Sequence, residues 1–346
     1  MLRRSFLVSG AASAASLAAM QGTPRVTLGV DLFSIRSQGW TPFQYLDYCA
    51  GLGAKVVHFS EIRFLGGLEE AHLKQVRSHA ERVGIEVELG MLSICPTSTR
   101  FDASKGTAEE QLTRMIVSAR TAGSPIVRAV LGSSADRVGA IPIEGHIENT
   151  VRVLRAVKSR AVDSGIKIAI ENHAGDMQAR ELKTLIEEAG RDFVGACIDS
   201  GNPLWALEDP HLTLETLAPY ALTSHVRDSA VWRAPTGVYA RWVRMGEGNV
   251  NIREFVRKYA VLCPGRALSL EVIVSAPRLF RIYDPAFWDG YRNVKAWEFA
   301  RFLALAEKGT PQETAKVPPA PRGQAAERER EDLEASFRVC KEMLAA

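Results

Sequence analysis

Two hydrophobic periods alternate along the chain from about residue 26 onward. Short, nearly continuous apolar runs are typical of strands in a parallel sheet that is covered on both faces. Eight such runs lie at residues 26–33, 54–60, 85–92, 124–132, 166–171, 192–199, 221–226 and 266–272. Between them, apolar residues recur three and four positions apart, which predicts amphipathic helices. These helices are expected at 41–53, across the stripe 73–83, at 107–122, 144–163, 179–190 and 211–219, from a cap at Asn251, and at 292–307.

Helix-start signals support two of these helices. Thr41 is a good N-cap and is followed by Pro42, which fits the first helical position because its missing N–H is not needed there. Asn251 is followed by Glu254 at the spacing of a capping box. Both patterns predict a helix that begins at the next residue.

Eight strand–helix units in a row predict a (β/α)₈ TIM barrel over residues 26–309. An open, doubly wound sheet is the alternative architecture. No G-x-G-x-x-G motif follows the first apolar run, which argues against the dinucleotide-binding form of such a sheet. Eight units are also the number that closes a barrel.

The N-terminal segment, residues 1–22, has the three regions of a signal peptide. The paired Arg3 and Arg4 precede a mild apolar stretch and small residues suited to cleavage. Paired arginines in this setting indicate twin-arginine export, so we expect a periplasmic protein. The alternative is an unprocessed, frayed N-terminus. The apolar stretch is short and contains serines, and no later stretch approaches the ~18 apolar residues of a membrane span.

The C-terminal segment changes in composition after the barrel. Residues 310–324 are rich in proline and polar residues, which is typical of a linker or strap. Residues 325–346 are charged and predict an amphipathic helix, with Leu333, Phe337 and Met343 on its apolar side. This helix either docks on the barrel or a second subunit, or it remains a solvated tail.

Composition and charge exclude several classes of protein. The chain has 346 residues, 46% of them hydrophobic, and a formal net charge of +3 from 43 basic and 40 acidic residues. Such a balance, without a run of Lys and Arg, argues against a nucleic-acid partner. The five cysteines are far apart and form no CxxC pair, so no disulfide framework is expected, and most should be buried as small apolar residues.

Four of the predicted strands end on residues that can bind a metal. They are Glu171, Asp199, His225 and Glu271, which follow consecutive strands. The carboxyl ends of barrel strands line one mouth, so these side chains can converge. Three carboxylates sharing a small site would repel one another unless a cation joined them. The donor set favours Mn²⁺, with Mg²⁺, Co²⁺ or Zn²⁺ as alternatives. Taken singly, each residue has an ordinary structural explanation, such as a turn or a salt bridge.

The motifs "IENHAGD", "CIDSGNP", "SHVRD", "GEGNVNIREFV" and "LSLEV" resemble the xylose-isomerase-like sugar phosphate isomerase/epimerase family. That family includes ketose 3-epimerases and inosose dehydratases, and endonuclease IV is a more distant relative. The resemblance covers most of residues 26–307 and implies the same four metal ligands. The chain departs from the epimerase pattern at Asn202, where those enzymes commonly carry a histidine. Export also departs from the cytosolic epimerases.

The expected reaction is proton removal beside a carbonyl. A metal would polarise the carbonyl of a keto sugar, and the resulting enediolate would be stabilised by the cation. Glu171 and Glu271 are the expected catalytic pair, one removing the proton and the other returning it on the opposite face. Expulsion of a leaving group from the same enediolate would instead make the enzyme a lyase or dehydratase on a keto sugar, keto-glycoside or inosose. Substrate-binding candidates are His58, Glu61, His173, Asn202 and Arg227.

Two further classes remain as alternatives. A metal-dependent phosphodiesterase or endonuclease would need several metal ions and more histidine than the seven in the chain. A periplasmic carbohydrate-binding protein would not need four converging metal ligands. The small-molecule partner is therefore expected to be a carbohydrate, and the protein a possible homo-oligomer.

Overall fold

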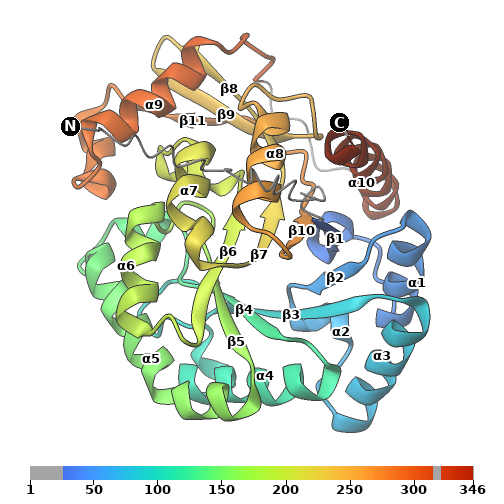
Figure 1. Cartoon of the computed structure of the whole chain (residues 1–346). Helices are drawn as coiled ribbons and strands as arrows, with labels where there is room; N and C mark the ends of the chain where they lie inside the picture. The colour runs from blue at the N-terminus through green and yellow to red at the C-terminus, as the bar shows by residue number, and fades with distance from the viewer. Residues whose placement is uncertain (1–25, 315–320, 346) are drawn as a thin grey trace, which may run out of the picture.

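A closed barrel of eight parallel strands forms the body of the protein, as seen in the computed structural model, which describes residues 26–314 and 321–345 (Figure 1). Around the barrel the strands follow the order β1, β10, β7, β6, β5, β4, β3, β2. Their bounds are β1 Thr27–Asp31, β2 Val56–Phe59, β3 Glu86–Ser93, β4 Ile126–Val130, β5 Lys167–Glu171, β6 Val194–Asp199, β7 Ala221–Val226 and β10 Ala267–Leu270. The predicted TIM barrel is confirmed.

The register of the strands places their last residues at one mouth. Asp199 is level with His225, and His225 is level with Ser269, two residues before Glu271. Glu171 is level with Cys197 on the neighbouring strand. Residues that lie tens of positions apart in the sequence are therefore neighbours at the carboxyl end of the barrel.

Helices cover the outer face of the barrel, and their apolar residues join the main core. Their bounds are α1 Pro42–Leu52, α2 Ile62–Leu65, α3 Glu70–Val83, α4 Ala108–Ala122, α5 Ile143–Ser164, α6 Ala179–Ala189, α7 Pro210–Leu217 and α8 Ile252–Leu262. Thr41 caps α1 with a complete capping box, and Pro42 occupies its first position. The Asn251 side chain accepts the Glu254 N–H at the start of α8, as its spacing predicts.

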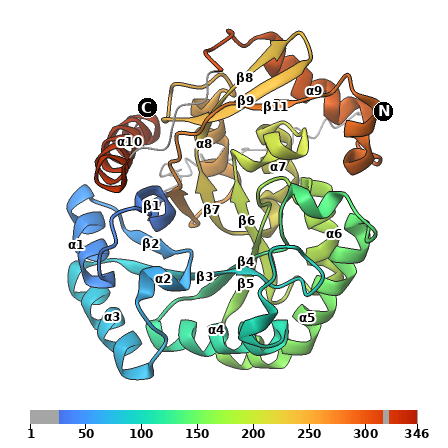
Figure 2. The same ribbon diagram turned by 180° about the vertical axis from the view of Figure 1, so that it is seen from behind.

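A second, antiparallel sheet was not expected from the sequence. It is built from β8 (Asp228–Ala234), β9 (Gly237–Val243) and β11 (Arg278–Phe280). The 3₁₀ helix η6 (Pro285–Tyr291) and α9 (Ala296–Glu307) accompany it, and α9 lies beside this sheet in both views of the molecule (Figures 1 and 2).

The last predicted ring helix, at 292–307, is therefore placed differently from the expectation. Phe302 and Ala306 of α9 pack with Val231 and Phe280 in a separate small core, not on the barrel. The sheet offers an apolar face that α9 covers, and this burial takes the helix away from the ring.

The C-terminal helix α10 (Arg322–Ala345) occupies the ring position instead, near α8 and α1 (Figure 2). Its apolar side is part of the main core, through Leu333, Phe337, Cys340 and Met343. Glu329 accepts hydrogen bonds from the Ser37 N–H and hydroxyl, and Tyr48 donates to Glu334. The helix is thus an integral part of the barrel wall rather than a solvated tail.

The expected signal peptide, residues 1–22, lies outside the described residues, as do residues 315–320 of the expected linker. None of the helices in the described part of the chain is both long and apolar enough to cross a membrane. All five cysteines are buried and free.

Candidate metal centre and active site

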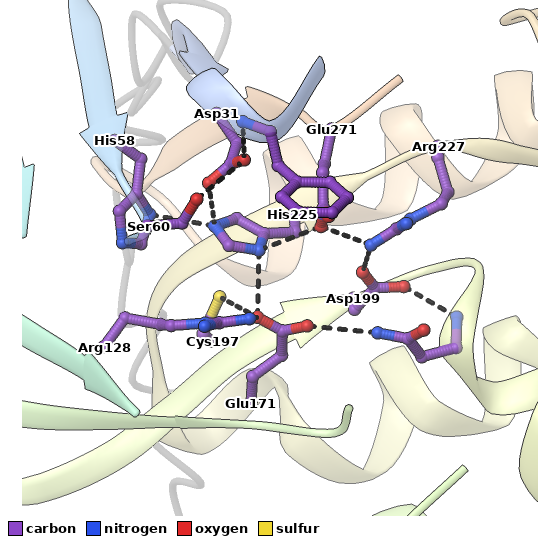
Figure 3. Close-up of polar contacts among 12 residues, drawn as sticks. Asp31, His58, Ser60, Arg128, Glu171, Cys197, Asp199, His225, Arg227 and Glu271 are labelled. Carbon is purple, nitrogen blue, oxygen red and sulfur yellow. Dashed lines mark hydrogen bonds and ion pairs between the residues drawn. The ribbon is translucent and has the colours of Figure 1, made fainter. Parts of the chain in front are cut away.

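The four residues expected to bind a metal come together at the mouth of the barrel. Each offers one ligand atom, and these four atoms all lie within 4.8 Å of one another. Glu171 and Asp199 end β5 and β6, His225 is the last residue but one of β7, and Glu271 directly follows β10 (Figure 3). Three of them are fully buried, and Glu271 is 7% exposed. Their role as ligands remains a prediction, but their convergence is a property of the fold.

The geometry at His225 fits a shared cation. Its Nδ1 lies 2.9 Å from Glu171 Oε2 and 3.1 Å from Glu271 Oε2. Adjacent ligands of an octahedral ion with bonds of roughly 2.1 Å are separated by about 3 Å. Nδ1 is buried and has no hydrogen-bond partner within the described part of the chain. A metal ion would allow a ring nitrogen and two carboxylates to face one another. Without metal, a proton on Nδ1 does so: burial acts to lower the pKa of His225, but acidic neighbours that include Asp31 and Glu171 hold it well above its usual value.

The opposite edge of the His225 ring, at Nε2, contacts a second buried cluster. Nε2 lies 3.2 Å from Asp31 Oδ2 and 2.9 Å from His58 Nδ1. Asp31 is fixed in turn, because its Oδ1 accepts the Phe33 N–H at 2.7 Å and the Ser60 hydroxyl at 3.0 Å. A carboxylate behind a ligating histidine sets the tautomer that exposes the other nitrogen to the metal.

Two buried arginines also belong to the site, and sequence reasoning missed the first. Arg128 on β4 donates from Nε to Glu171 Oε2 at 2.6 Å and from Nη1 to the Met91 carbonyl at 3.2 Å. Arg227 donates from Nη2 to both Asp199 Oδ2 and Glu271 Oε2. Each arginine therefore shares carboxylate oxygens with the expected metal.

The charges of these groups match a divalent ion. The four carboxylates of the site are those of Asp31, Glu171, Asp199 and Glu271, and they face the two guanidinium groups of Arg128 and Arg227. Buried charges persist only when they are compensated. The buried carboxylates outnumber the guanidinium groups, and a divalent cation would offset the excess negative charge. The chemistry of the donors, the two carboxylate oxygens beside Nδ1 and this excess of negative charge all fit a resident metal ion.

The pKa shifts of the carboxylates reflect their crowding. Burial raises the pKa of Asp199 to about 7 against the opposing charge of Arg227, and burial raises the pKa of Asp31 to about 6 against the opposing charge of His225. Burial also acts to raise the pKa of Glu171, but Arg128 and His225 together hold that pKa well below its usual value.

A thiol also reaches this cluster. Cys197 Sγ lies 3.9 Å from Glu171 Oε2, and Cys197, Glu171 and His225 offer atoms close enough to share an ion. Burial raises the pKa of the thiol to about 12, so the thiol is protonated when no metal is bound. The oxygen-rich set with Asp199 and Glu271 is the better candidate.

Of the five residues expected to bind substrate, three contact the expected metal ligands. Asn202 donates from Nδ2 to Glu171 Oε1 at 3.0 Å, Arg227 contacts two expected ligands, and His58 contacts a third. These three side chains therefore support the cluster directly. His173 and Glu61 form no hydrogen bond or ion pair with it among the described residues. His173 Nδ1 lies 2.7 Å from the Gly132 carbonyl oxygen and interacts with Glu171 through charge, whereas Glu61 pairs with Arg63.

The missed residues left traces in the sequence. The first strand was expected to run to Phe33, but β1 ends at Asp31, so a carboxylate at a strand end was hidden inside the predicted range. Arg128 is a single charge in the apolar run 124–132, and it is 4% exposed. A lone arginine inside a buried strand needs a buried anion, which is the signal that could have pointed to Glu171.

Comparison with known proteins agrees with the fold. A family model described as "Xylose isomerase-like TIM barrel" matches residues 45–277. The chain is 25% identical over 188 residues to the 3-oxo-isoapionate decarboxylase of Pectobacterium atrosepticum, a match that covers 54% of this chain and 61% of that protein. The chain thus spans less than two thirds of the length of the curated relatives it matches.

Two solved structures illustrate the structural likeness. A structure of L-ribulose 3-epimerase superposes with a TM-score of 0.58 at 15% identity, covering 92% of this chain and 96% of that chain. The IOLI protein with a bound zinc atom gives a TM-score of 0.53 at 15% identity, covering 81% and 96%. At these identities the likeness establishes the fold alone. The family match covers most of the barrel strands, and the chain belongs to the xylose isomerase-like TIM barrel family.

Proposed function

We propose that the protein is a divalent-metal-dependent enzyme that removes the proton beside the carbonyl of a keto carbohydrate, acting as an isomerase or epimerase. The observation that carries this proposal is the convergence of Glu171, Asp199, His225 and Glu271 at the mouth of the barrel. The epimerases, dehydratase and decarboxylase among the similar proteins support an enzyme of this general kind. Export to the periplasm and a homo-oligomeric state are further parts of the proposal.

The four residues would hold the metal, and Mn²⁺ suits three carboxylates and one imidazole. Mg²⁺, Co²⁺ and Zn²⁺ are the alternatives, and a zinc atom is bound in the IOLI structure. Such an ion would supply Lewis-acid polarisation of the substrate carbonyl.

Glu271 is the best-placed general base. Its side chain is 9% exposed, whereas those of Glu171, Asp199 and His225 are fully buried, so substrate reaches Glu271 first. Its Oε2 contacts His225 and Arg227, and within the described part of the chain no hydrogen bond or ion pair engages Oε1. A carboxylate oxygen that is free beside the substrate can accept a proton.

Glu171 would return the proton in an epimerase. It comes from β5, whereas Glu271 follows β10, and β7 and β6 lie between these strands in the barrel. The two carboxylates therefore enter the site from different directions. Delivery of the proton to the opposite face of the carbon inverts its configuration.

A lyase is the second candidate, and one observation favours it. Both oxygens of Glu171 are already engaged, Oε2 by Arg128 and Oε1 by Asn202. This leaves Glu271 as a single base, which is enough for β-elimination but not for inversion. Decarboxylation needs no base, because loss of CO₂ forms the enediolate directly, and a single group that returns a proton completes it. The similarity to a decarboxylase is consistent with this outcome.

The test is an exchange experiment with the metal-loaded protein. Ketopentoses, ketohexoses, an inosose and a 3-keto-glucoside are incubated in D₂O with Mn²⁺ and followed by NMR. Deuterium should enter the carbon beside the carbonyl, together with an epimer for the first candidate or an eliminated product for the second. Protein treated with a chelator serves as the control. Saturation with Mn²⁺ but no exchange and no turnover of any of these compounds would contradict the proposal.

A further inference from the structure

Arg227 directly follows β7 (Ala221–Val226) and is 2% exposed. A single nitrogen, Nη2, donates to Asp199 Oδ2 and to Glu271 Oε2 (Figure 3). The guanidinium carbon lies 4.5 Å from the centre of the Trp242 ring, so the aromatic face supports the cation from behind. Arg227 thus bridges two of the four expected ligands.

The bridged oxygens are the ones that a metal ion would need. Asp199 Oδ1 accepts the Gly201 and Asn202 N–H groups at 2.7 Å each, which leaves Oδ2 as its ligand atom. Glu271 Oε2 is the oxygen that lies 3.1 Å from His225 Nδ1. The guanidinium and the expected metal would therefore compete for the same two oxygen atoms, Asp199 Oδ2 and Glu271 Oε2.

Arg128 provides the contrast within the same site. It contacts one carboxylate, Glu171, and is anchored by the Met91 carbonyl. Arg227 has no comparable anchor, because its Nε–H is buried without a partner in the described residues. A buried donor without an acceptor costs free energy. The observed position of Arg227 therefore carries a cost that a position with an acceptor for Nε–H would not have.

We infer that Arg227 is an exchangeable counter-cation: it neutralises Asp199 and Glu271 when no metal is bound, and metal binding releases it to donate to a substrate oxygen. This inference deepens the proposed function and rests on it. The released guanidinium would take an acceptor-only oxygen, either the keto group or a carboxylate. Because linkage is reciprocal, a substrate that binds the released Arg227 also tightens metal binding.

The test compares the metal affinity of two matched variants. Arg227→Met removes the competing cation, so its Kd for Mn²⁺, measured by isothermal titration calorimetry, should fall about tenfold. Arg137→Met is the control, because Arg137 is also buried and its Nη1 lies 2.8 Å from Glu181, a carboxylate that is not one of the four expected ligands. Both variants should melt at lower temperature without metal, but only Arg227→Met should gain Mn²⁺ affinity and a larger metal-induced rise in Tm.

A second measurement uses the wild-type protein and does not depend on folding of the Arg227 variant. Departure of the guanidinium from the Trp242 ring should change tryptophan fluorescence when Mg²⁺ is added, and Trp242→Phe should lose most of this change. Adding a ketohexose or a 2-keto-aldonate should lower the Kd for Mg²⁺ in the wild type but not in Arg227→Gln. An effect of the ketohexose indicates that Arg227 binds the keto oxygen, whereas an effect of the 2-keto-aldonate alone indicates that it binds the carboxylate.

The outcomes separate the inference from the proposed function. Equal or weaker Mn²⁺ binding by Arg227→Met, with a normal control, would overturn the exchange and make Arg227 a helper of the metal site. A wild type that binds no divalent metal would instead defeat the proposed function. In that case, Mn²⁺ binding gained by Arg227→Met would still support competition for Asp199 and Glu271.

Discussion

Asp31 Oδ2 lies 3.2 Å from His225 Nε2, on the side of the ring that faces away from the expected metal. The first strand of the barrel therefore orients a side chain on the seventh. When Nε2 carries the ring proton, between Asp31 Oδ2 and His58 Nδ1, the lone pair of Nδ1 faces the expected metal position beside Glu171 and Glu271. The carboxylate behind the histidine is as much a part of the site as the residues in front of it.

Asp31→Asn should lower the affinity for Mn²⁺ by about 10- to 100-fold. Phe33 N–H and the Ser60 hydroxyl both donate to Asp31 Oδ1, so the amide oxygen must take that place. The amide NH₂ then faces His225 Nε2 and favours the tautomer in which Nε2 accepts and the ring proton lies on Nδ1. Calorimetric titration with Mn²⁺ measures the loss. Ser60→Ala keeps the charge and should bind within about threefold of the wild type; equal losses in both variants would reject the tautomer argument.

Glu271→Gln should reduce deuterium exchange at least about 100-fold at saturating Mn²⁺, because the general base is lost. If the enzyme is an epimerase, Glu171→Gln should form the epimer at least about 100-fold more slowly, because Glu171 returns the proton. If it is a lyase, Glu171→Gln should still exchange deuterium, because Glu271 alone removes the proton. NMR in D₂O measures exchange, and metal analysis of each variant separates chemistry from loss of the ion. Glu208→Gln, in a buried carboxylate outside the cluster, should exchange like the wild type. Unchanged exchange in both Glu171→Gln and Glu271→Gln would remove both residues from the mechanism.

Phe337→Ala should destabilise the metal-free protein by about 3–5 kcal/mol, because a buried phenyl ring is replaced by a cavity. Phe337 on α10 is 2% exposed and belongs to the main core. Urea unfolding followed by circular dichroism measures the free energy of unfolding. Arg338→Ala changes the next, exposed residue and should alter stability by less than about 0.5 kcal/mol. A small effect of Phe337→Ala would mean that α10 is not part of the barrel wall in solution.

Glu208 should make the protein less stable as the pH rises. Burial raises its pKa from 4.5 to about 7, although the Thr213 hydroxyl donates to it at 2.6 Å. The folded state therefore binds the proton more tightly than the unfolded state. Its favourable contribution is complete below pH 4.5 and is lost as the pH rises to about 7.

Glu208→Gln tests this dependence, because the amide does not titrate. The free energy of unfolding of the wild type minus that of the variant should fall by about 1–3 kcal/mol between roughly pH 4.5 and pH 8. Urea titrations across this range measure it. The difference isolates Glu208 from other titrating groups, and a difference that stays constant with pH would contradict the raised pKa.

Much of the barrel could be predicted from the sequence because its signals are local. Continuous apolar runs separated by amphipathic stretches specify strands and helices in order, and caps such as Thr41 set helix starts. The predicted ligands also follow from order alone, since parallel strands present their carboxyl ends at one mouth. Glu171, Asp199, His225 and Glu271 needed only to be at strand ends to meet.

The partners of these residues could not be predicted in the same way. Arg227 and Asn202 are predicted to bind substrate, and the structure adds that they donate to carboxylates of the expected ligands, which no local pattern indicated. Arg128 and Asp31 were overlooked, although they hold Glu171 and His225. Which donor meets which acceptor depends on distances across the barrel, and no local pattern encodes those distances.

The amino-acid sequence by itself determined the order of the eight barrel strands and of most helices between them, and through that order the four side chains at the mouth of the barrel. Only the tertiary structure decided that α9 covers the sheet of β8, β9 and β11 while α10 fills the ring, because both helices have an apolar side and the available surfaces select between them. The same holds for the charges of the site. Buried ions are compensated by whichever groups packing brings within reach, and this choice is made in three dimensions.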